Sequence, residues 1–209
     1  MRKTSAWAGL LLLLCAAPAV AQSRGLSFAA WGSYTTGTST TTVDEAFGEK
    51  ADFESAWGAG LGVGYGFAGF LEADVTASFL RTRGRLDLLG SEAVNLGYLR
   101  MVPISVLLRF HPAKSGAVDP WIGVGGAWVM FNRLDTDDLT AAVGGPVEVK
   151  DRAAFVVDGG LAFRLAPGFC FFVGGSYMPL RPVSRGPSGS ELTLKLDPVT
   201  ASTGFRIGM

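Results

Sequence analysis

The sequence predicts an all-β protein, an eight-stranded antiparallel up-and-down β-barrel that spans a membrane. Three observations predict this fold: an amino-terminal export signal, eight segments in which residue character alternates, and connections that alternate between long and short. After the export signal no stretch is apolar for 18 or more residues, so no helical span is expected. An exported apolar chain without such a helix leaves two options, a soluble all-β domain or a transmembrane barrel.

The first 21 residues have the form of a secretory signal peptide. Arg2 and Lys3 precede an apolar run over residues 6–17, and Ala19-Val20-Ala21 follows as a small-x-small cleavage site. The run is shorter than the roughly 20 residues that a membrane-spanning helix needs. Cys15 follows Leu14, where a lipoprotein signal would carry a small residue. We therefore expect a signal peptide over 1–21 and a barrel over 22–209, located in the cell outer membrane.

Composition excludes several classes of function. Without Arg2 and Lys3 the chain keeps 16 of its 18 basic side chains and all 18 acidic ones, which argues against nucleic-acid binding. Cys170 is the one cysteine after the signal, so no internal disulfide can form. With His111 as the single histidine, metal clusters and most acid–base sites lose support. The glycine runs at 58–66 and 123–126 lack the G-x-x-x-x-G-K-[ST] pattern of a phosphate loop. No cofactor, metal or enzymatic activity is predicted.

A period of two identifies the strands. Over residues 54–67, Trp57, Leu61 and Tyr65 share one face, whereas the opposite face is mostly glycine. Over 71–79, Leu71, Ala73, Val75, Ala77 and Phe79 alternate with Glu72, Asp74, Thr76 and Ser78. A narrow closed barrel needs small side chains inside, so the low charge and the glycine face favour lipid outside and a polar lumen. The predicted strands are 25–36, 54–67, 70–83, 94–110, 119–133, 152–165, 169–181 and 192–209.

The connections support a membrane barrel. Segments 37–53, 134–151 and 182–191 are long, 84–93 is intermediate, and 68–69 and 166–168 are tight. Segment 111–118 is a turn-rich connection, and 35–42 is a threonine-rich, low-complexity tract. Short periplasmic turns and long external loops give this alternation, and an even strand count places both termini at the periplasmic side.

The alternation also assigns side chains to the lumen. The inward-facing charged candidates are Glu54, Glu72, Asp74, Arg109, Asp158, Arg164 and Arg206, and the inward-facing apolar candidates are Met101, Leu107 and Trp128. Because an isolated buried charge is costly, opposite charges are expected to pair or to meet water. Such residues form either a structural salt-bridge network or a polar constriction that filters solutes. The aromatic residues near strand ends or on strand faces are expected to form interfacial girdles, with Trp128 also a lumen candidate. They are Trp31, Tyr34, Trp57, Tyr65, Tyr98, Trp121, Trp128 and Tyr177.

Three segments resemble the outer membrane protein W family. Residues 103–112 (PISVLLRFHP) look like its proline-led fourth strand with an aromatic–His turn. Residues 119–131 (DPWIGVGGAWVMF) are similar to its Pro-aromatic-x-Gly-x-Gly fifth strand, and residues 196–209 resemble its last strand, which opens with Asp-Pro. The chain ends in Met209 where such barrels end in an aromatic residue, although Phe205, Ile207 and Met209 keep the apolar alternation.

The resemblance implies a channel rather than an enzyme, one that passes small hydrophobic molecules across the outer membrane. The implied partners are outer-membrane lipid, the assembly machinery that reads the last strand, and small hydrophobic solutes. A structural or interaction barrel, with a filled lumen and loops that bind a partner or surface, is the alternative. A lipid-modifying enzyme would rest on His111, which sits in a predicted periplasmic turn instead of at the external side.

Overall fold

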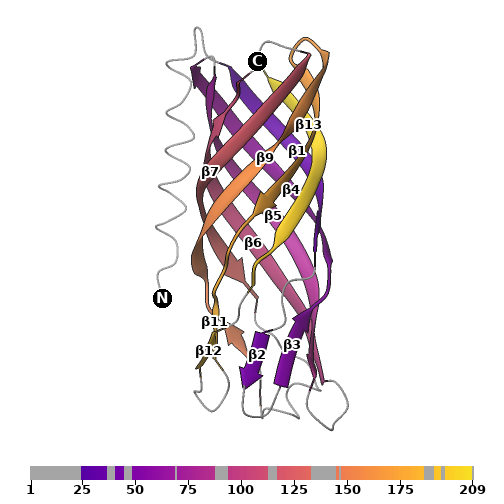
Figure 1. Cartoon of the computed structure of the whole chain (residues 1–209), viewed down its shortest axis with the longest axis vertical. Coiled ribbons are helices and arrows are strands. Elements are labelled where there is room, and N and C mark those ends of the chain that lie inside the picture. Colours follow the sequence, from indigo (N-terminus) through magenta and orange to yellow (C-terminus); the bar gives the residue numbers. More distant parts are fainter. Residues whose placement is uncertain are drawn as a thin grey trace.

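A computed structural model describes residues 25–36, 41–44, 49–68, 70–87, 94–112, 117–132, 145, 147–185, 191–193 and 196–208. Eight strands form the barrel wall: β1 (Leu26–Thr35), β4 (Ala56–Ala68), β5 (Leu71–Asp87), β6 (Val94–Phe110), β7 (Val118–Phe131), β9 (Arg152–Ala166), β10 (Phe169–Tyr177) and β13 (Val199–Gly208). Each strand pairs antiparallel with the next, and β1 pairs with both β4 and β13, which closes the barrel (Figure 1). The predicted fold class is confirmed. The predicted signal peptide lies outside the described residues and stays a prediction.

The two ends of the barrel differ. We call the end with the β4–β5, β6–β7 and β9–β10 connections and the end of β13 the turn end, drawn uppermost in Figure 1. The opposite end, the loop end, carries the other four connections. At the β9–β10 turn, Pro167 precedes Gly168, whose φ of 71° suits the third position of a type II turn. The connections therefore alternate between the two ends of the barrel, as the sequence predicted.

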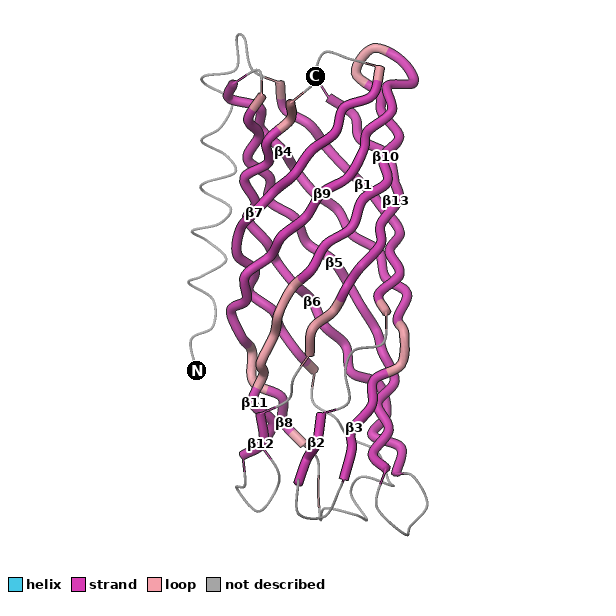
Figure 2. The backbone as a smooth tube through the Cα atoms, in the orientation of Figure 1, coloured by secondary structure: helices cyan, strands magenta, loops and turns pink. Residues whose placement is uncertain are grey.

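Short strands at the loop end extend the structure beyond the barrel wall (Figure 2). The hairpin of β2 (Thr41–Asp44) and β3 (Glu49–Phe53) adds to the extended end of β5. A separate sheet joins β8 (Glu148–Val149), β11 (Val183–Arg185) and β12 (Glu191–Thr193). The sequence predicted no strand at β2, β3, β8 or β11, because segments this short carry too little alternation to be read.

Two predicted strands are shorter than expected. The segment predicted as 192–209 divides into β12 and β13, and Pro198, which has no N–H to donate, stands just before β13. The segment predicted as 169–181 ends as β10 at Tyr177, two residues before Pro179. The two chain segments stay together beyond the barrel through a bridge between Leu180 and Leu196, with N–H···O distances of 2.7 and 2.9 Å.

Each wall strand has an apolar outer face and a small or polar inner face. On the outside Leu61, Ile122 and Phe155 are each more than half exposed. So large an apolar surface, continuous around a closed barrel, is the face that a membrane barrel presents to lipid. Within the described residues no helix combines the length and apolar character required to cross a bilayer.

Candidate functional site

The lumen holds three layers of different chemistry. Nearest the loop end is a buried apolar cluster, which we call the apolar plug. Part of it comes from the wall strands and part from connections that fold inward. Its buried members are Phe53, Leu80, Leu99, Met101, Leu107, Ala127, Val129, Val149, Val156, Met178, Leu180 and Leu196. Leu99, Val129 and Leu180 are at most 1% exposed, so this mouth of the barrel is filled rather than hollow.

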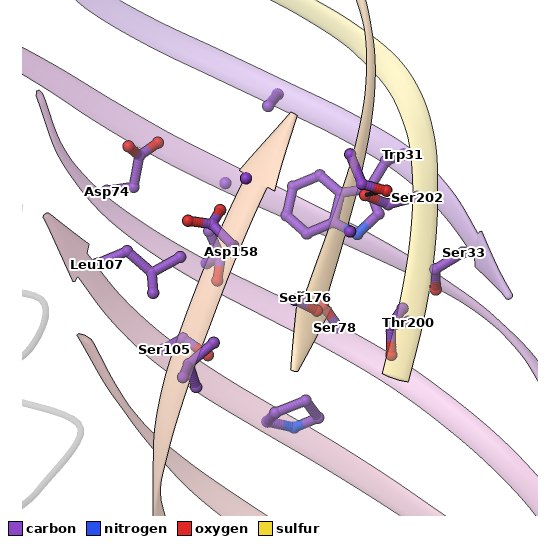
Figure 3. Close-up of a pocket in the computed structure, with 18 of the residues that line it drawn as sticks. Trp31, Ser33, Asp74, Ser78, Ser105, Leu107, Asp158, Ser176, Thr200 and Ser202 are labelled. Atoms are coloured by element: carbon purple, nitrogen blue, oxygen red, sulfur yellow. Dashed lines mark hydrogen bonds between the residues drawn. The ribbon is translucent and has the colours of Figure 1, made fainter. Parts of the chain in front are cut away.

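A polar cavity of about 100 Å³ lies on the turn-end side of the apolar plug (Figure 3). Hydroxyl groups of several strands line it, among them Ser33, Thr76 and Ser105, together with Leu107 from the plug. The rings of Trp31, Trp121 and Phe172 bound the cavity, and Phe172 meets both indoles edge-on at 6.3 and 5.9 Å. These three aromatic residues form the second layer across the lumen.

The glycine face of the wall makes room for these indoles. A Cβ at Gly60 would overlap the ring of Trp31, and one at Gly160 would overlap the ring of Trp121. The sequence assigned both tryptophans to the interfacial girdles, but each occupies an inward position of its strand, so that assignment is wrong for them. Tyr34 and Trp57 do lie on the outer face, with ring centroids 4.9 Å apart.

An ion-pair network forms the third layer, which lines the same cavity as the aromatic layer, with the Arg109 guanidinium carbon 5.8 Å from the Trp121 ring centroid. Arg109 binds Asp74 (Nη1–Oδ1 3.1 Å) and donates to Asp158 through Nε (2.8 Å) and Nη2 (2.5 Å). Arg206 lies 3.2 Å from Glu72 and 3.6 Å from Asp74. All five side chains are at most 14% exposed. The network ties β5, β6, β9 and β13 together across the lumen.

His111 extends this network. It follows β6, and its N–H donates to the Phe70 carbonyl, as expected for a turn residue. Its ring, however, is buried inside the barrel, with Nδ1 3.0 Å from the Asp119 carboxylate and Nε2 3.5 Å from Glu72. Ser27 also donates to Glu72, over 2.9 Å. The sequence interpretation of His111 as a turn residue was correct about the backbone and missed the side chain.

The other predicted lumen residues divide between four places. Met101 and Leu107 lie in the apolar plug, and Arg164 lines an open recess of about 800 Å³ at the turn end. Glu54 is exposed at the loop end, because the strand begins at Ala56 and the alternation does not reach it. Trp128 does not face the lumen. It is 52% exposed on the outer face, with Ile122 and Val124, since the β7 register runs without a bulge.

One interruption occurs in the barrel wall between β5 and β6. Ala77 pairs with Ile104 and Leu80 with Met101, in one register, but Ser78–Pro103 and Phe79–Val102 are not paired. Pro103 has no N–H with which to pair with β5. On its other side it still pairs with Val129 of β7. Ser78 and Pro103 line the inner cavity, and Ser78, Phe79 and Val102 line an outer groove of about 700 Å³. Ser78 at this interruption thus borders both the inner cavity and the outer groove, and the groove extends from there over β4, β1 and β13.

Comparison with known proteins decides the family, since the OmpW family model matches residues 32–207. The chain belongs to the OmpW family. No curated protein matches its sequence.

Solved structures show the same fold. OprG from Pseudomonas aeruginosa superposes with a TM-score of 0.73 at 18% identity, over 89% of this chain and 95% of OprG. AlkL, solved in DMPC lipid bilayers, gives 0.58 at 18% identity, over 89% of each chain. Neisserial surface protein A gives 0.54 at 12% identity, over 87% of this chain and 96% of that one. This OmpW-family chain is accordingly an outer-membrane β-barrel.

Proposed function

We propose that this OmpW-family barrel passes small hydrophobic molecules from the loop end into the bilayer, through the side of the barrel. The solute replaces the side chains of the apolar plug, reaches the level of Leu80 and Leu107, and leaves between β5 and β6. It does not travel the full axis. The interruption at Ser78–Pro103, which borders both the inner cavity and the outer groove, is the observation that carries the proposal.

The order of the layers supports this route. An apolar solute is stabilised among side chains such as Leu99 and Met101, which are buried in the plug. Closer to the turn end the solute would meet Arg109, Asp74 and Asp158. Displacing these paired groups would leave buried charges without partners. Motion toward the turn end is therefore unfavourable, whereas motion toward lipid stays within apolar surroundings.

The wall supports the route as well. Separating two strands normally breaks ladder hydrogen bonds in a medium without water, at a cost of several kcal/mol for each orphaned group. At Pro103 the cost of separating β5 from β6 is lower, because the Ser78–Pro103 and Phe79–Val102 pairs are already absent. The outer groove at this level is lined by small residues such as Ala59 and Ala77 beside Phe79, an apolar surface on which an emerging solute can rest.

Uptake into liposomes tests the proposal. Wild-type protein should accelerate the uptake of a fluorescent hydrophobic probe over protein-free liposomes. Pro103→Ala restores an N–H that can pair with β5, and it should slow uptake about fivefold, the effect of one net hydrogen bond of about 1 kcal/mol on the open population. Pro120→Ala is the matched control, since Pro120 sits on β7 within an unbroken ladder to β9 and should leave uptake unchanged.

A structural barrel is the second candidate, and the small free volume of about 100 Å³ inside the lumen favours it. Its loop-end sheets would then bind a partner or surface. The same assay separates the two. Uptake by wild-type protein no faster than in protein-free liposomes contradicts passage and supports the structural barrel, and equal rates for wild type and Pro103→Ala contradict the lateral route.

A further inference from the structure

Three arginines stand together on the outer face of the barrel at the loop end. Arg81 and Arg83 are outward positions of β5, and Arg100 is an outward position of the neighbouring strand β6. We call these three residues the arginine cluster. Arg81 and Arg100 are exposed, and among the described residues no carboxylate lies within ion-pair distance of any of the three. The cluster is thus a group of positive charges without acidic partners there.

The cluster marks the edge of the apolar band. On the outer face of β5, Phe79 is followed two residues later by Arg81, and on β6, Val102 is preceded two residues earlier by Arg100. Two residues of strand span about 7 Å, so the surface changes from apolar to basic within one step. The outward run from Leu71 to Phe79 has the length of roughly 9–11 residues with which a tilted strand crosses a bilayer. The arginine cluster therefore lies at headgroup depth.

The arrangement within the cluster is costly unless an anion is present. Arg81 and Arg100 are direct cross-strand partners, and like charges in that position destabilise a sheet. Tyr98 holds two of the guanidinium groups in place. The Arg81 guanidinium carbon lies 3.7 Å from the Tyr98 ring centroid, and Arg83 lies 5.1 Å from it while donating to the phenol oxygen over 2.7 Å. The N–H donors are consequently pre-positioned on a rigid hairpin.

We propose that the arginine cluster binds the phosphate groups of outer-leaflet lipid. Guanidinium groups recognise phosphate through paired N–H donors, and a bound phosphate removes the repulsion between Arg81 and Arg100. In barrels of this kind the long connections face outward, which places the loop end at the outer leaflet. Membrane lipid is the occupant, because the lipid-facing surface leads directly into the cluster through Phe79 and Val102. This inference does not depend on the passage of any solute.

Thermal unfolding of the full-length protein tests the site, with heat-modifiable mobility as the readout. The probes are bis-phosphorylated lipid A, lipid A with both phosphates removed, and inorganic phosphate, each added to protein in a zwitterionic detergent. The variants are Arg100→Gln and Arg81→Gln/Arg100→Gln. Arg152→Gln is the matched control, an exposed loop-end arginine on β9 opposite Val129, away from the cluster.

Bis-phosphorylated lipid A should raise the unfolding temperature of wild type and of Arg152→Gln alike. The double variant should bind it about 30-fold more weakly, the effect expected for two basic residues near an anionic lipid surface. Without lipid, Arg100→Gln should unfold no earlier than wild type, because a like-charge pair has been removed. If the double variant does not fold, Arg81→Lys/Arg100→Lys, which keeps the charge and loses the paired donors, should show weakened binding in its place.

Three results would overturn the proposal. Equal stabilisation by dephosphorylated lipid A would show that acyl chains, rather than phosphate, are recognised. Equal stabilisation of wild type and the double variant would place the lipid elsewhere. A full shift with inorganic phosphate at the same phosphate concentration would assign the site to free anions instead of membrane lipid.

Discussion

At the scale of single residues, the glycines of the inner face determine how the lumen is filled. Gly123 stands directly beneath the contact between Arg109 and Asp158, and a Cβ there would overlap the Asp158 carboxylate and lie 2.8 Å from Arg109 Cγ. Gly126, three residues along the same strand, would place its Cβ 3.7 Å from the nearest atom, the Ala154 carbonyl oxygen. The two glycines look alike in sequence, but only Gly126 has room for a Cβ atom.

Gly123→Ala should therefore lower the free energy of unfolding by about 1–3 kcal/mol, the usual cost of overfilling a packed interior. Urea unfolding of the detergent-solubilised barrel, followed by the heat-modifiable band, measures it. Gly126→Ala should change stability by less than about 0.5 kcal/mol, as is normal for a substitution that disturbs no packed contact. Equal effects at both positions would contradict the assignment of Gly123 to the ion-pair layer.

The two-residue alternation predicts which face of a strand a residue occupies. It says little about which side chains that residue contacts. It assigned Glu72, Asp74 and Arg109 to one inward face, and the structure places them in one network. It gave no sign that His111 enters that network, because the residue follows the strand and no alternation covers it. Trp121 shares its parity with Gly123, which was the available signal for its inward position. Partners on strands far apart along the chain, such as Glu72 and Arg206, leave no local signature at all.

At the scale of elements, the connections take part in closing the barrel. Leu180 and Leu196 lie outside the wall strands, pair with each other, and bury their side chains in the apolar plug. The sequence predicted continuous strands here, since apolar residues continue past Tyr177 and before Val199. Proline at 179, 182 and 198 changes the course of the backbone, and that bend turns both leucines into the lumen mouth.

Leu180→Gln should detach these connections from the plug. Leu180 is 1% exposed, so the amide would be buried without water, and we expect a loss of about 2–4 kcal/mol from the lost apolar burial together with the cost of the polar group. Limited proteolysis with proteinase K should cut the 178–198 region faster than in wild type. Arg181→Lys, which keeps a charge for the ion pair with Asp197 at the neighbouring exposed position, should be cut at the wild-type rate, and faster cutting of this control would show that Leu180 has no special role.

At the scale of the whole molecule, a closed axis and an interrupted wall coexist. The apolar plug lies nearest the loop end, and the aromatic residues and the ion-pair network lie together around the cavity beyond it. The interruption at Pro103 lies between the plug and the network. On the proposed route apolar molecules exchange with the bilayer, whereas an ion would have to be desolvated to enter the filled lumen.

Planar bilayer recordings should accordingly show no stepwise conductance above the protein-free baseline, under conditions in which the same preparation takes up hydrophobic probe. A heat-modifiable band in the reconstituted sample establishes that folded protein is present. Stable open steps at low voltage would contradict the closed axis, and they would require the three layers to rearrange together.

The pairing of β1 with β13 has a consequence for how the molecule assembles. Ser27 lies opposite Gly208, so the contacts that complete the wall join positions at the two extremes of the described chain. The pairing of β1 with β13 makes the contact order high. The chain loses the entropy of bringing these two strands together before their hydrogen bonds can form. Before β13 has paired, β1 and β10 each have an unpaired edge. The bilayer interior offers no other hydrogen-bond partners to these edges. Folding should thus be cooperative and slow, without a stable smaller barrel along the way.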